Sequence, residues 1–382
     1  MQVSDLRIAL FSGNYNITVD GANRALNRLV GYLLRCGAAV RVYSPTVENP
    51  GMEPVGDLVS LPSLPIPTRS EYRFSTGVNA RIRRDLAEFA PNIVHVSAPD
   101  ISGHRAVSWA RDQGLPVVAS VHTRFETYLP YYHLGLLAPA AIALQRRFYR
   151  RCDALVAPSQ SMVDVLRTER MGSDIGIWSR GVDRTIFDPA RRDLAWRRSL
   201  GIADGDFVIG FLSRVVMEKG LDVFCDTIDE LRRRGVAHKV LVVGEGPARA
   251  WFEERLSDGI FIGFTGGQSL GRAVASMDVM FFPSETEAFG NVSLEAMASG
   301  IPVVAAAATG SENLVDDGQS GRLIAPGNIA GYADAIAAYV GNRQLAQGHG
   351  AAGEVLSRDY DWDKINQAVA DTYIRKITER AG

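Results

Sequence analysis

The feature that most constrains this chain is a rhythm of short apolar runs, rich in β-branched residues, that alternate with amphipathic stretches. The rhythm starts twice. The first set of runs spans residues 6–11, 39–43, 93–96, 117–121 and 154–157, and the second spans 207–212, 240–243, 260–263, 279–282 and 303–306. Short buried strands separated by helices predict a parallel sheet with helices on both faces. Two sets within 382 residues predict an α/β protein with two doubly wound, Rossmann-like domains.

The same pattern predicts where the domains divide. We expect an N-terminal domain over residues 1–185 and a C-terminal domain over 186–363, joined by a charged, proline-containing linker near 181–193. Residues 364–382 continue an amphipathic helix that starts near 362, and packing back on the N-terminal domain is one of its two options. Residues 54–67 contain four prolines and are predicted to form an irregular loop.

Composition excludes several classes of function. Hydrophobic residues make up 46% of the chain, charged residues make up 22%, and the net charge is −2, so nothing indicates a nucleic-acid partner. Residues 1–184 hold 21 arginines and no lysine against 16 acids, whereas the remainder holds 20 basic and 27 acidic residues. A basic first half favours an anionic membrane surface or acidic acceptor, and ordinary scatter of surface charge explains it equally well. The oligomeric state stays open.

Cysteine usage and the leading residues bear on location. Cys36, Cys152 and Cys225 lie far apart without metal-ligand spacing, which suits a reducing cytoplasm. We see no signal-peptide pattern and no uninterrupted apolar run of about 18 residues. The expected location is therefore cytoplasmic, with peripheral attachment to the inner face of the plasma membrane as a hypothesis.

The strongest constellation of residues lies at 283–300. A predicted strand ends at Phe282, a loop follows, and a helix begins near Asn291 and stops at Gly300. A glycine turn that leads into a helix presents free N–H groups and the positive end of the helix dipole, so it favours an anion such as a diphosphate. The residues expected to line this anion site are Phe289, Gly290, Asn291 and Val292.

Two carboxylates bracket that helix start. Glu295 lies about one turn inside the helix, where it can accept hydrogen bonds from both hydroxyls of a ribose. Glu287 precedes the helix and would face the group attached to the distal phosphate. The alternative is that both glutamates have no role in binding, Glu287 as a solvated loop residue and Glu295 as a residue of the helix surface. The Phe-Gly turn and the apolar residues that follow argue against this alternative.

A second segment, at 211–220, supplies positive charge. A strand delivers Arg214, and Lys219 precedes the next helix. Arginine grips phosphate oxygens through a planar fork and lysine adds a compact point charge. Gly244 follows another strand, but the third glycine of a dinucleotide fingerprint is missing, which counts against a dehydrogenase.

Residues 287–305 resemble the E-x7-E signature of retaining glycosyltransferases of family 4, and the resemblance extends along nearly the whole chain. It implies the GT-B fold, in which two Rossmann-like domains face a cleft. It also implies that Arg214 and Lys219 neutralise the diphosphate of a nucleotide-sugar donor, and that Glu287, Arg214, Lys219 and His122 are catalytic. The loop that contains Gly244 resembles the family's strand-end loop near the donor base, so Gly244 is expected to bind the donor. The nucleotide-sugar is a substrate, and we expect no cofactor and no metal ion.

The resemblance also assigns residues of the first half. Gly13, Asp20 and Gly21 lie in the loop after the first strand, and in family members this loop approaches the donor phosphates. His122 ends a strand where open α/β sheets bind ligands, and the family's matching histidine contacts the transferred sugar. The residues expected on the acceptor side are Arg124, Glu126 and Tyr131.

The stretch 128–137 is aromatic and apolar, and an arginine cluster over 146–151 follows it. This combination fits an anionic bilayer surface, and a core-facing helix with a charged rim fits it equally. The stretch most resembles GDP-mannose-dependent mannosyltransferases and sulfoquinovosyl-diacylglycerol synthases. We therefore expect transfer of a hexose or hexuronate from GDP-mannose or a UDP-sugar to a lipid or lipid-linked glycan. A GT-B phosphorylase or epimerase, or a non-catalytic nucleotide-sugar-binding protein, is the alternative.

Overall fold

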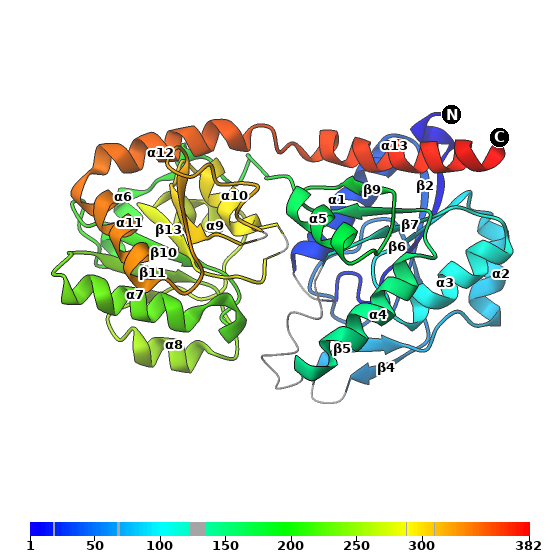
Figure 1. Ribbon diagram of the computed structural model, residues 1–382, viewed down its shortest axis with the longest axis horizontal. Coiled ribbons are helices and arrows are strands. Elements are labelled where there is room, and N and C mark those ends of the chain that lie inside the picture. The colour runs from blue at the N-terminus through cyan, green and yellow to red at the C-terminus, as the bar shows by residue number, and fades with distance from the viewer. Residues whose placement is uncertain (18–19, 67–68, 123–134, 288, 309) are drawn as a thin grey trace. The chain divides into compact units, whose positions relative to one another are not determined.

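The computed structural model describes the whole chain except residues 18–19, 67–68, 123–134, 288 and 309. Its contacts divide the chain into two compact units. Unit 1 comprises Met1–Arg180 together with Trp362–Gly382, and unit 2 comprises Gly181–Asp361. Figure 1 shows that each unit is a sheet with helices on both of its faces.

Unit 1 is built on a seven-stranded parallel sheet with the order β3-β2-β1-β6-β7-β8-β9. Its central strands β6, β7 and β8 are buried over their whole length, as expected for a sheet covered on both faces. All five strands predicted for this half are confirmed, and β3 and β9 are additional. The strand bounds are β1 Arg7–Phe11, β2 Ala39–Ser44, β3 Asp57–Ser60, β6 Ile93–Val96, β7 Val117–Ser120, β8 Ala154–Ala157 and β9 Ile175–Ile177.

The helices of unit 1 follow its strands. Helix α1 shows the common pattern, with a capping aspartate, a buried apolar face and a left-handed Gly37 just after its end. The helix bounds are η1 Val3–Asp5, α1 Gly21–Arg35, α2 Ala80–Phe89, α3 Ile101–Asp112, η3 Gly135–Leu137, α4 Ala138–Tyr149, α5 Gln160–Thr168 and α13 Trp362–Ala381.

The proline-rich stretch 54–67 is more ordered than predicted. It contains β3 and the strand β4 (Ser63–Ile66), which pairs antiparallel with β5 (Arg69–Ser75) in a separate two-stranded sheet. The loop prediction was wrong because proline is compatible with a strand that is paired on one side only. Strand β3 lies at the edge of its sheet, and Pro65 lies in a hairpin strand whose one partner in the described sheets is β5.

Unit 2 is built on a six-stranded parallel sheet with the order β12-β11-β10-β13-β14-β15. The five predicted strands are confirmed, and β15 is additional. Along β10 the side chains alternate between two cores: Ile209 and Phe211 pack on one face of the sheet, and Val208 and Leu212 pack on the other. The strand bounds are β10 Val208–Leu212, β11 Lys239–Val243, β12 Ile260–Phe261, β13 Val279–Phe282, β14 Val303–Ala306 and β15 Gly321–Ile324.

The helices of unit 2 cover both cores. Helices α7 and α11 pack together over the aromatic core around Phe211, and α12 packs on α10. The helix bounds are η4 Pro189–Arg191, α6 Leu194–Ser199, η5 Met217–Lys219, α7 Leu221–Arg233, α8 Arg249–Arg255, α9 Gly267–Ala275, α10 Asn291–Ala298, α11 Ile329–Gly341 and α12 Arg343–Ser357.

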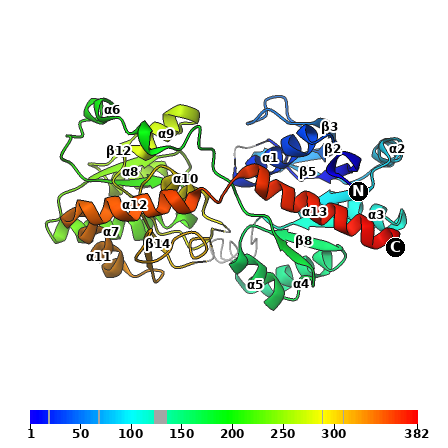
Figure 2. The same cartoon turned by 90° about the horizontal axis from the view of Figure 1, so that it is seen from above.

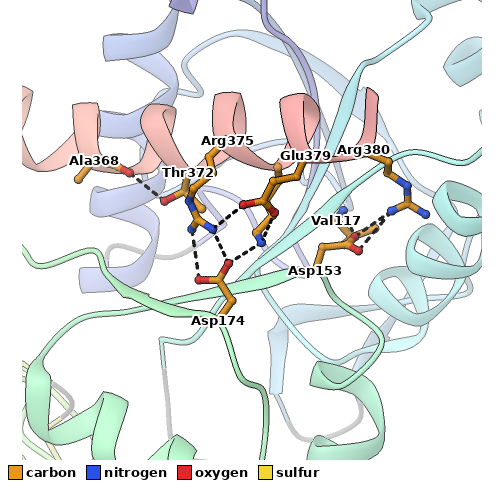
Figure 3. Close-up of polar contacts among 9 residues, drawn as sticks. Val117, Asp153, Asp174, Ala368, Thr372, Arg375, Glu379 and Arg380 are labelled. Atoms are coloured by element: carbon orange, nitrogen blue, oxygen red, sulfur yellow. Dashed lines mark hydrogen bonds and ion pairs between the residues drawn. The ribbon is translucent and has the colours of Figure 1, made fainter. Parts of the chain in front are cut away.

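Helix α13 belongs to unit 1, where it packs beside α1 and against β8 (Figure 2). Ion pairs connect this helix to acidic residues elsewhere in unit 1. Arg375 Nη1 lies 2.6 Å and Lys376 Nζ lies 2.5 Å from Asp174 Oδ2, and Arg380 Nη1 lies 3.2 Å from Asp153 Oδ2 (Figure 3). The hydrogen bond from Arg375 lowers the pKa of Asp174, which opposes the effect of its partial burial.

Two glycines of α12 test how helix α10 is held in place. A Cβ atom at Gly350 would lie 2.1 Å from the carbonyl oxygen of Gly300, whereas a Cβ at Gly348 would meet nothing within 4 Å. Gly350→Ala should therefore lower the free energy of unfolding by about 1–3 kcal/mol through overpacking. Gly348→Ala should raise it by up to about 1 kcal/mol, because alanine is the better helix former. Denaturant titration of both variants checks this, and equal effects would contradict the packing.

Candidate active site

The loop between β13 and α10 leads through a glycine turn into the start of a helix in unit 2. Gly290 precedes α10 with φ 90° and ψ 49°, a left-handed conformation that favours glycine. A Cβ at Gly290 would also lie 3.1 Å from the carbonyl oxygen of Gly310. Among the described residues, none caps α10 through its side chain, and the positive end of the helix dipole lies at this helix start.

A lysine and a glutamate meet beside this helix start. Lys219 Nζ donates a hydrogen bond to Glu287 Oε1, and both side chains are about one-fifth exposed (18% and 19%). The two residues come from different predicted motifs that lie 68 positions apart. The structure therefore brings the cationic segment and the E-x7-E segment together at one place.

Close backbone approach makes that meeting possible. Gly220 follows Lys219 in a left-handed conformation (φ 71°), and a Cβ there would lie 3.0 Å from the carbonyl oxygen of Pro283. Thr286 Oγ1 donates a hydrogen bond of 3.1 Å to the carbonyl oxygen of Glu218. The loops after β10 and β13 are thus packed directly on each other.

The loop after β11 is seated on the same edge of the sheet. A Cβ at Gly244 (φ 139°) would lie 1.9 Å from the carbonyl oxygen of Ser213, and a Cβ at Gly246 would lie 2.2 Å from that of Val215. Three strand-end loops therefore form one continuous rim at the carboxyl ends of β10, β11 and β13, where open α/β sheets bind their ligands.

The other residues of unit 2 that were predicted to bind the donor differ in the solvent exposure of their side chains. Arg214 is exposed on this rim, and within the described part of the chain it makes no ion pair. Glu295 and Val292 are half-buried on α10. Phe289 is buried, with its ring 5.8 Å from that of Tyr360, so its ring supports the loop from below and its backbone is what can face a ligand.

Sequence reasoning missed Gly310. A Cβ at this position would lie 2.5 Å from the Cβ atom of Glu287 and 2.7 Å from its carbonyl oxygen. Gly310 therefore allows the Glu287 loop to take its observed path. It is 23 residues away from Glu287 in the sequence, and no local pattern marks it.

In unit 1, the loop after β1 contains the predicted residues Gly13, Asp20 and Gly21. Asp20 caps α1: its Oδ1 accepts a hydrogen bond of 2.8 Å from Asn23 N, and Gly21 is the first residue of the helix. A Cβ at Gly13 would lie 2.6 Å from Oδ2 of Asp100, a half-buried carboxylate that the sequence analysis did not single out. Burial raises the pKa of Asp100 despite its hydrogen bonds within α3.

His122 lies just beyond β7, and both of its ring nitrogens bind protein groups. Nε2 lies 2.8 Å from Ser120 Oγ and Nδ1 lies 3.0 Å from Arg180 Nη2. Burial lowers the pKa of His122 well below its ordinary value, and the Arg180 guanidinium lowers it further. No local pattern marks Arg180, which lies 58 positions away from His122. The predicted acceptor residues Arg124, Glu126 and Tyr131 fall outside the described residues.

Comparison with known proteins agrees with this geometry. Residues 206–342 match the family described as "Glycosyl transferases group 1", and residues 19–185 match "Glycosyltransferase Family 4". The GDP-mannose-dependent alpha-mannosyltransferase of Mycobacterium tuberculosis is 31% identical over 347 residues, which cover 89% of each chain. Sulfoquinovosyl transferase SQD2 of Arabidopsis thaliana is 29% identical, over 93% of this chain and 71% of that protein.

Among solved structures, sucrose-phosphate synthase from Thermosynechococcus elongatus superposes with a TM-score of 0.79 at 19% identity, over 96% of this chain and 98% of that one. This likeness shows that the fold is GT-B. Fold, strand-end rim and sequence relatives together establish that the chain belongs to glycosyltransferase family 4. It is a hexosyltransferase that uses a nucleotide-sugar.

The site predicts a specific effect of removing the Lys219 ammonium group. Lys219→Ala should lower kcat/KM by about 100-fold or more, because charge on the leaving group would lose its positioned cation. Lys239→Ala is the matched control, since Lys239 is exposed at the opposite, amino end of β11 and should leave kcat/KM unchanged. Steady-state kinetics of both variants provide the measurement, and equal activity in the two variants would contradict the assignment.

Proposed function

We propose that this chain transfers a hexose from GDP-mannose to an acceptor hydroxyl with retention of anomeric configuration; the UDP-sugars are the alternative donors. The observation that carries the proposal is the Lys219–Glu287 pair beside the uncapped start of α10, within one rim of unit 2. The donor assignment is supported by relatives at 30% and 31% identity that are named GDP-mannose-dependent alpha-mannosyltransferases.

The chemistry of the reaction explains these residue types. Breaking the bond between the anomeric carbon and the donor phosphate builds negative charge on the diphosphate. In our proposal Lys219 and Arg214 balance that charge from one side, and the N–H groups at Gly290 and Asn291 balance it from the other. Lys219 forms an ion pair with Glu287, so in our proposal the ammonium group lies between this carboxylate and the diphosphate.

The two carboxylates take different parts of the donor in this proposal. Glu287 accepts hydrogen bonds from the sugar hydroxyls, and Glu295 accepts those of the ribose. Retention follows if the acceptor attacks from the face that the phosphate leaves and the departing phosphate oxygen takes the acceptor's proton. No protein nucleophile and no glycosyl-enzyme intermediate are then required. The oxygen–carbon bond to the acceptor forms as the donor oxygen–carbon bond breaks.

A panel of nucleotide-sugars tests the donor. A donor present at 100 times its Kd stabilises the folded protein by about 2.7 kcal/mol, so thermal shift should single out GDP-mannose over GDP-glucose and the UDP-sugars. Stabilisation by a UDP-sugar alone would overturn the donor assignment and leave the transferase class intact.

Glu287→Gln should retain nucleotide binding and lose turnover, because the amide keeps the shape of the side chain and loses its charge.

A requirement for a second substrate separates transfer from the rival activities. A transferase releases nucleotide in proportion to a glycosylated, non-nucleotide product. Phosphorylase activity would need phosphate as the second substrate, an epimerase would need none, and a non-catalytic binding protein would release nothing. Family membership supports transfer among these.

We further propose that unit 1 docks on an anionic membrane, where a lipid acceptor would lie. Support comes from the start of α4, where Leu136, Leu137 and Leu144 are 97%, 53% and 65% exposed and Arg147 and Arg150 are exposed on the same helix and just after it. Exposed leucines beside arginines suit the interfacial zone of an anionic bilayer. In the described part of the chain, no helix is both long enough and apolar enough to span a bilayer.

Flotation with vesicles tests the membrane surface. Wild type should float with vesicles that contain phosphatidylglycerol and remain unbound with pure phosphatidylcholine. Replacing Leu136, Leu137 and Leu144 with serine should abolish flotation, because each leucine contributes apolar area to the interface. Val355→Ser is the control, since Val355 is 57% exposed on helix α12 of unit 2. Equal flotation of the triple variant and wild type would remove the proposal.

A further inference from the structure

A chain of hydrogen-bonded polar side chains runs through unit 1, from the half-buried His122 at the end of β7 to helix α13. Arg180 Nη2 lies 3.0 Å from His122 Nδ1, and His122 Nε2 lies 2.8 Å from Ser120 Oγ. Ser120 Oγ lies 2.8 Å from His95 Nε2, and His95 Nδ1 lies 2.6 Å from Tyr373 Oη. Arg180 is 4% exposed, and His95, Ser120 and Tyr373 are exposed by 1% or less.

Arg180 fixes the direction of these hydrogen bonds. A guanidinium group only donates, so Nδ1 of His122 must accept and its ring hydrogen must lie on Nε2. Nε2 then donates to Ser120 Oγ. One obligate donor thus sets the tautomer of His122.

The indole of Trp178 holds the same groups in place. The guanidinium carbon of Arg180 lies 5.0 Å from the centre of the Trp178 ring, and the ring of His122 meets the indole edge-on at 5.5 Å. Trp178 Nε1 donates a hydrogen bond of 3.1 Å to Oδ1 of Asn366 on α13. Arg180 Nη1 donates to the carbonyl oxygens of Trp178 at 2.8 Å and Ser179 at 3.2 Å, which hold the guanidinium group further.

The charges around the network oppose protonation of either histidine. Within the described residues, the charged and titratable groups that face His122 are Arg180 and His95. A proton added to His122 would have to sit on Nδ1 and point at the guanidinium. Burial lowers the pKa of His95 to about 3, and it lowers the pKa of Arg180 to about 10, which leaves Arg180 charged at neutral pH.

We propose that Arg180 is a positioning residue that locks His122 as a neutral imidazole with both ring nitrogens engaged. His122 then shapes the end of β7 without exchanging protons with a substrate. The part that concerns the substrate rests on the proposed function, whereas the hydrogen-bond directions do not. The network also joins both chain crossings between the units, because Arg180 is the last residue before unit 2 and α13 begins where the chain returns.

The first test is independent of transferase activity. Long-range ¹H–¹⁵N spectra of the histidine rings, assigned with His122→Gln, report which nitrogen carries the hydrogen. In wild type we expect His122 to be protonated on Nε2 alone and to stay so between pH 5.5 and 8. A protonated Nδ1, or an ordinary titration of His122 within this range, would overturn the proposal whether or not the protein transfers sugar.

Substitutions then test the role of Arg180. Arg180→Met keeps most of the apolar stem and removes the donors, so Nδ1 of His122 should lose its fixed role as acceptor and the ring should populate both neutral tautomers. Arg180→Lys keeps an obligate donor and should restore the wild-type spectrum. Unchanged His122 signals in Arg180→Met would contradict the proposal. Should Arg180→Met fail to fold, Ser120→Ala serves instead: with Arg180 in place, His122 Nδ1 should remain unprotonated, and a hydrogen on Nδ1 in this variant would contradict the proposal.

The activity readout separates positioning from general damage. Arg180→Met should lower kcat roughly 10- to 100-fold through misplacement of His122, with the donor Kd unchanged because the nucleotide rim lies in unit 2. Arg180→Lys should recover most of the wild-type kcat, because it keeps a donor toward His122. An equal loss in the Lys and Met variants would indicate a merely structural role and overturn the positioning proposal.

Discussion

Everything assigned to the donor site depends on the seating of three strand-end loops directly on one another's backbones. Glycines at 220, 244, 246 and 310 leave no room for a Cβ atom, and this allows the loops after β10, β11 and β13 to share one rim. Only with that approach can the ammonium group of Lys219 reach the carboxylate of Glu287. The ion pair between Lys219 and Glu287 therefore depends on the close packing of these loops, because that packing brings the two side chains together.

The parallel sheet explains why the rim is where it is. All strands of the unit 2 sheet point the same way, so their carboxyl ends and the helix start of α10 meet at one edge. The two cores on either side of β10 hold that edge from below, with Phe289 as part of one core. Unit 1 is also built on a parallel sheet, but its polar groups differ. At the end of strand β7, the imidazole of His122 takes part in a network of hydrogen bonds with buried side chains.

Much of this was predictable from the sequence because its signals are local and periodic. Apolar runs revealed five strands of each sheet, and a glycine turn before an amphipathic segment located the start of α10 within one residue. The short edge strands β9 and β15 were not predicted, because they are three and four residues long and only partly buried. Proline content misled the reading of residues 54–67, because proline excludes a central strand and is tolerated in an edge strand or hairpin.

The parts of the site that were missed depend on contacts between distant residues. Gly310 matters because of Glu287, and Arg180 matters because of His122; neither residue carries a local signature. The family resemblance implies that His122 contacts the transferred sugar, whereas its contacts with Ser120 and Arg180 were not predicted. Hydrogen-bond partners from separate strands are fixed by tertiary packing, which a single sequence does not encode in any periodic form.

The most direct measurement of the central claim is a crystal structure of the protein with GDP-mannose or GDP bound. The account predicts the diphosphate at the rim of unit 2, with Nζ of Lys219 and the first N–H groups of α10 each within about 3 Å of a phosphate oxygen. A nucleotide bound elsewhere, with Lys219 still paired to Glu287 and no phosphate at the start of α10, would contradict it.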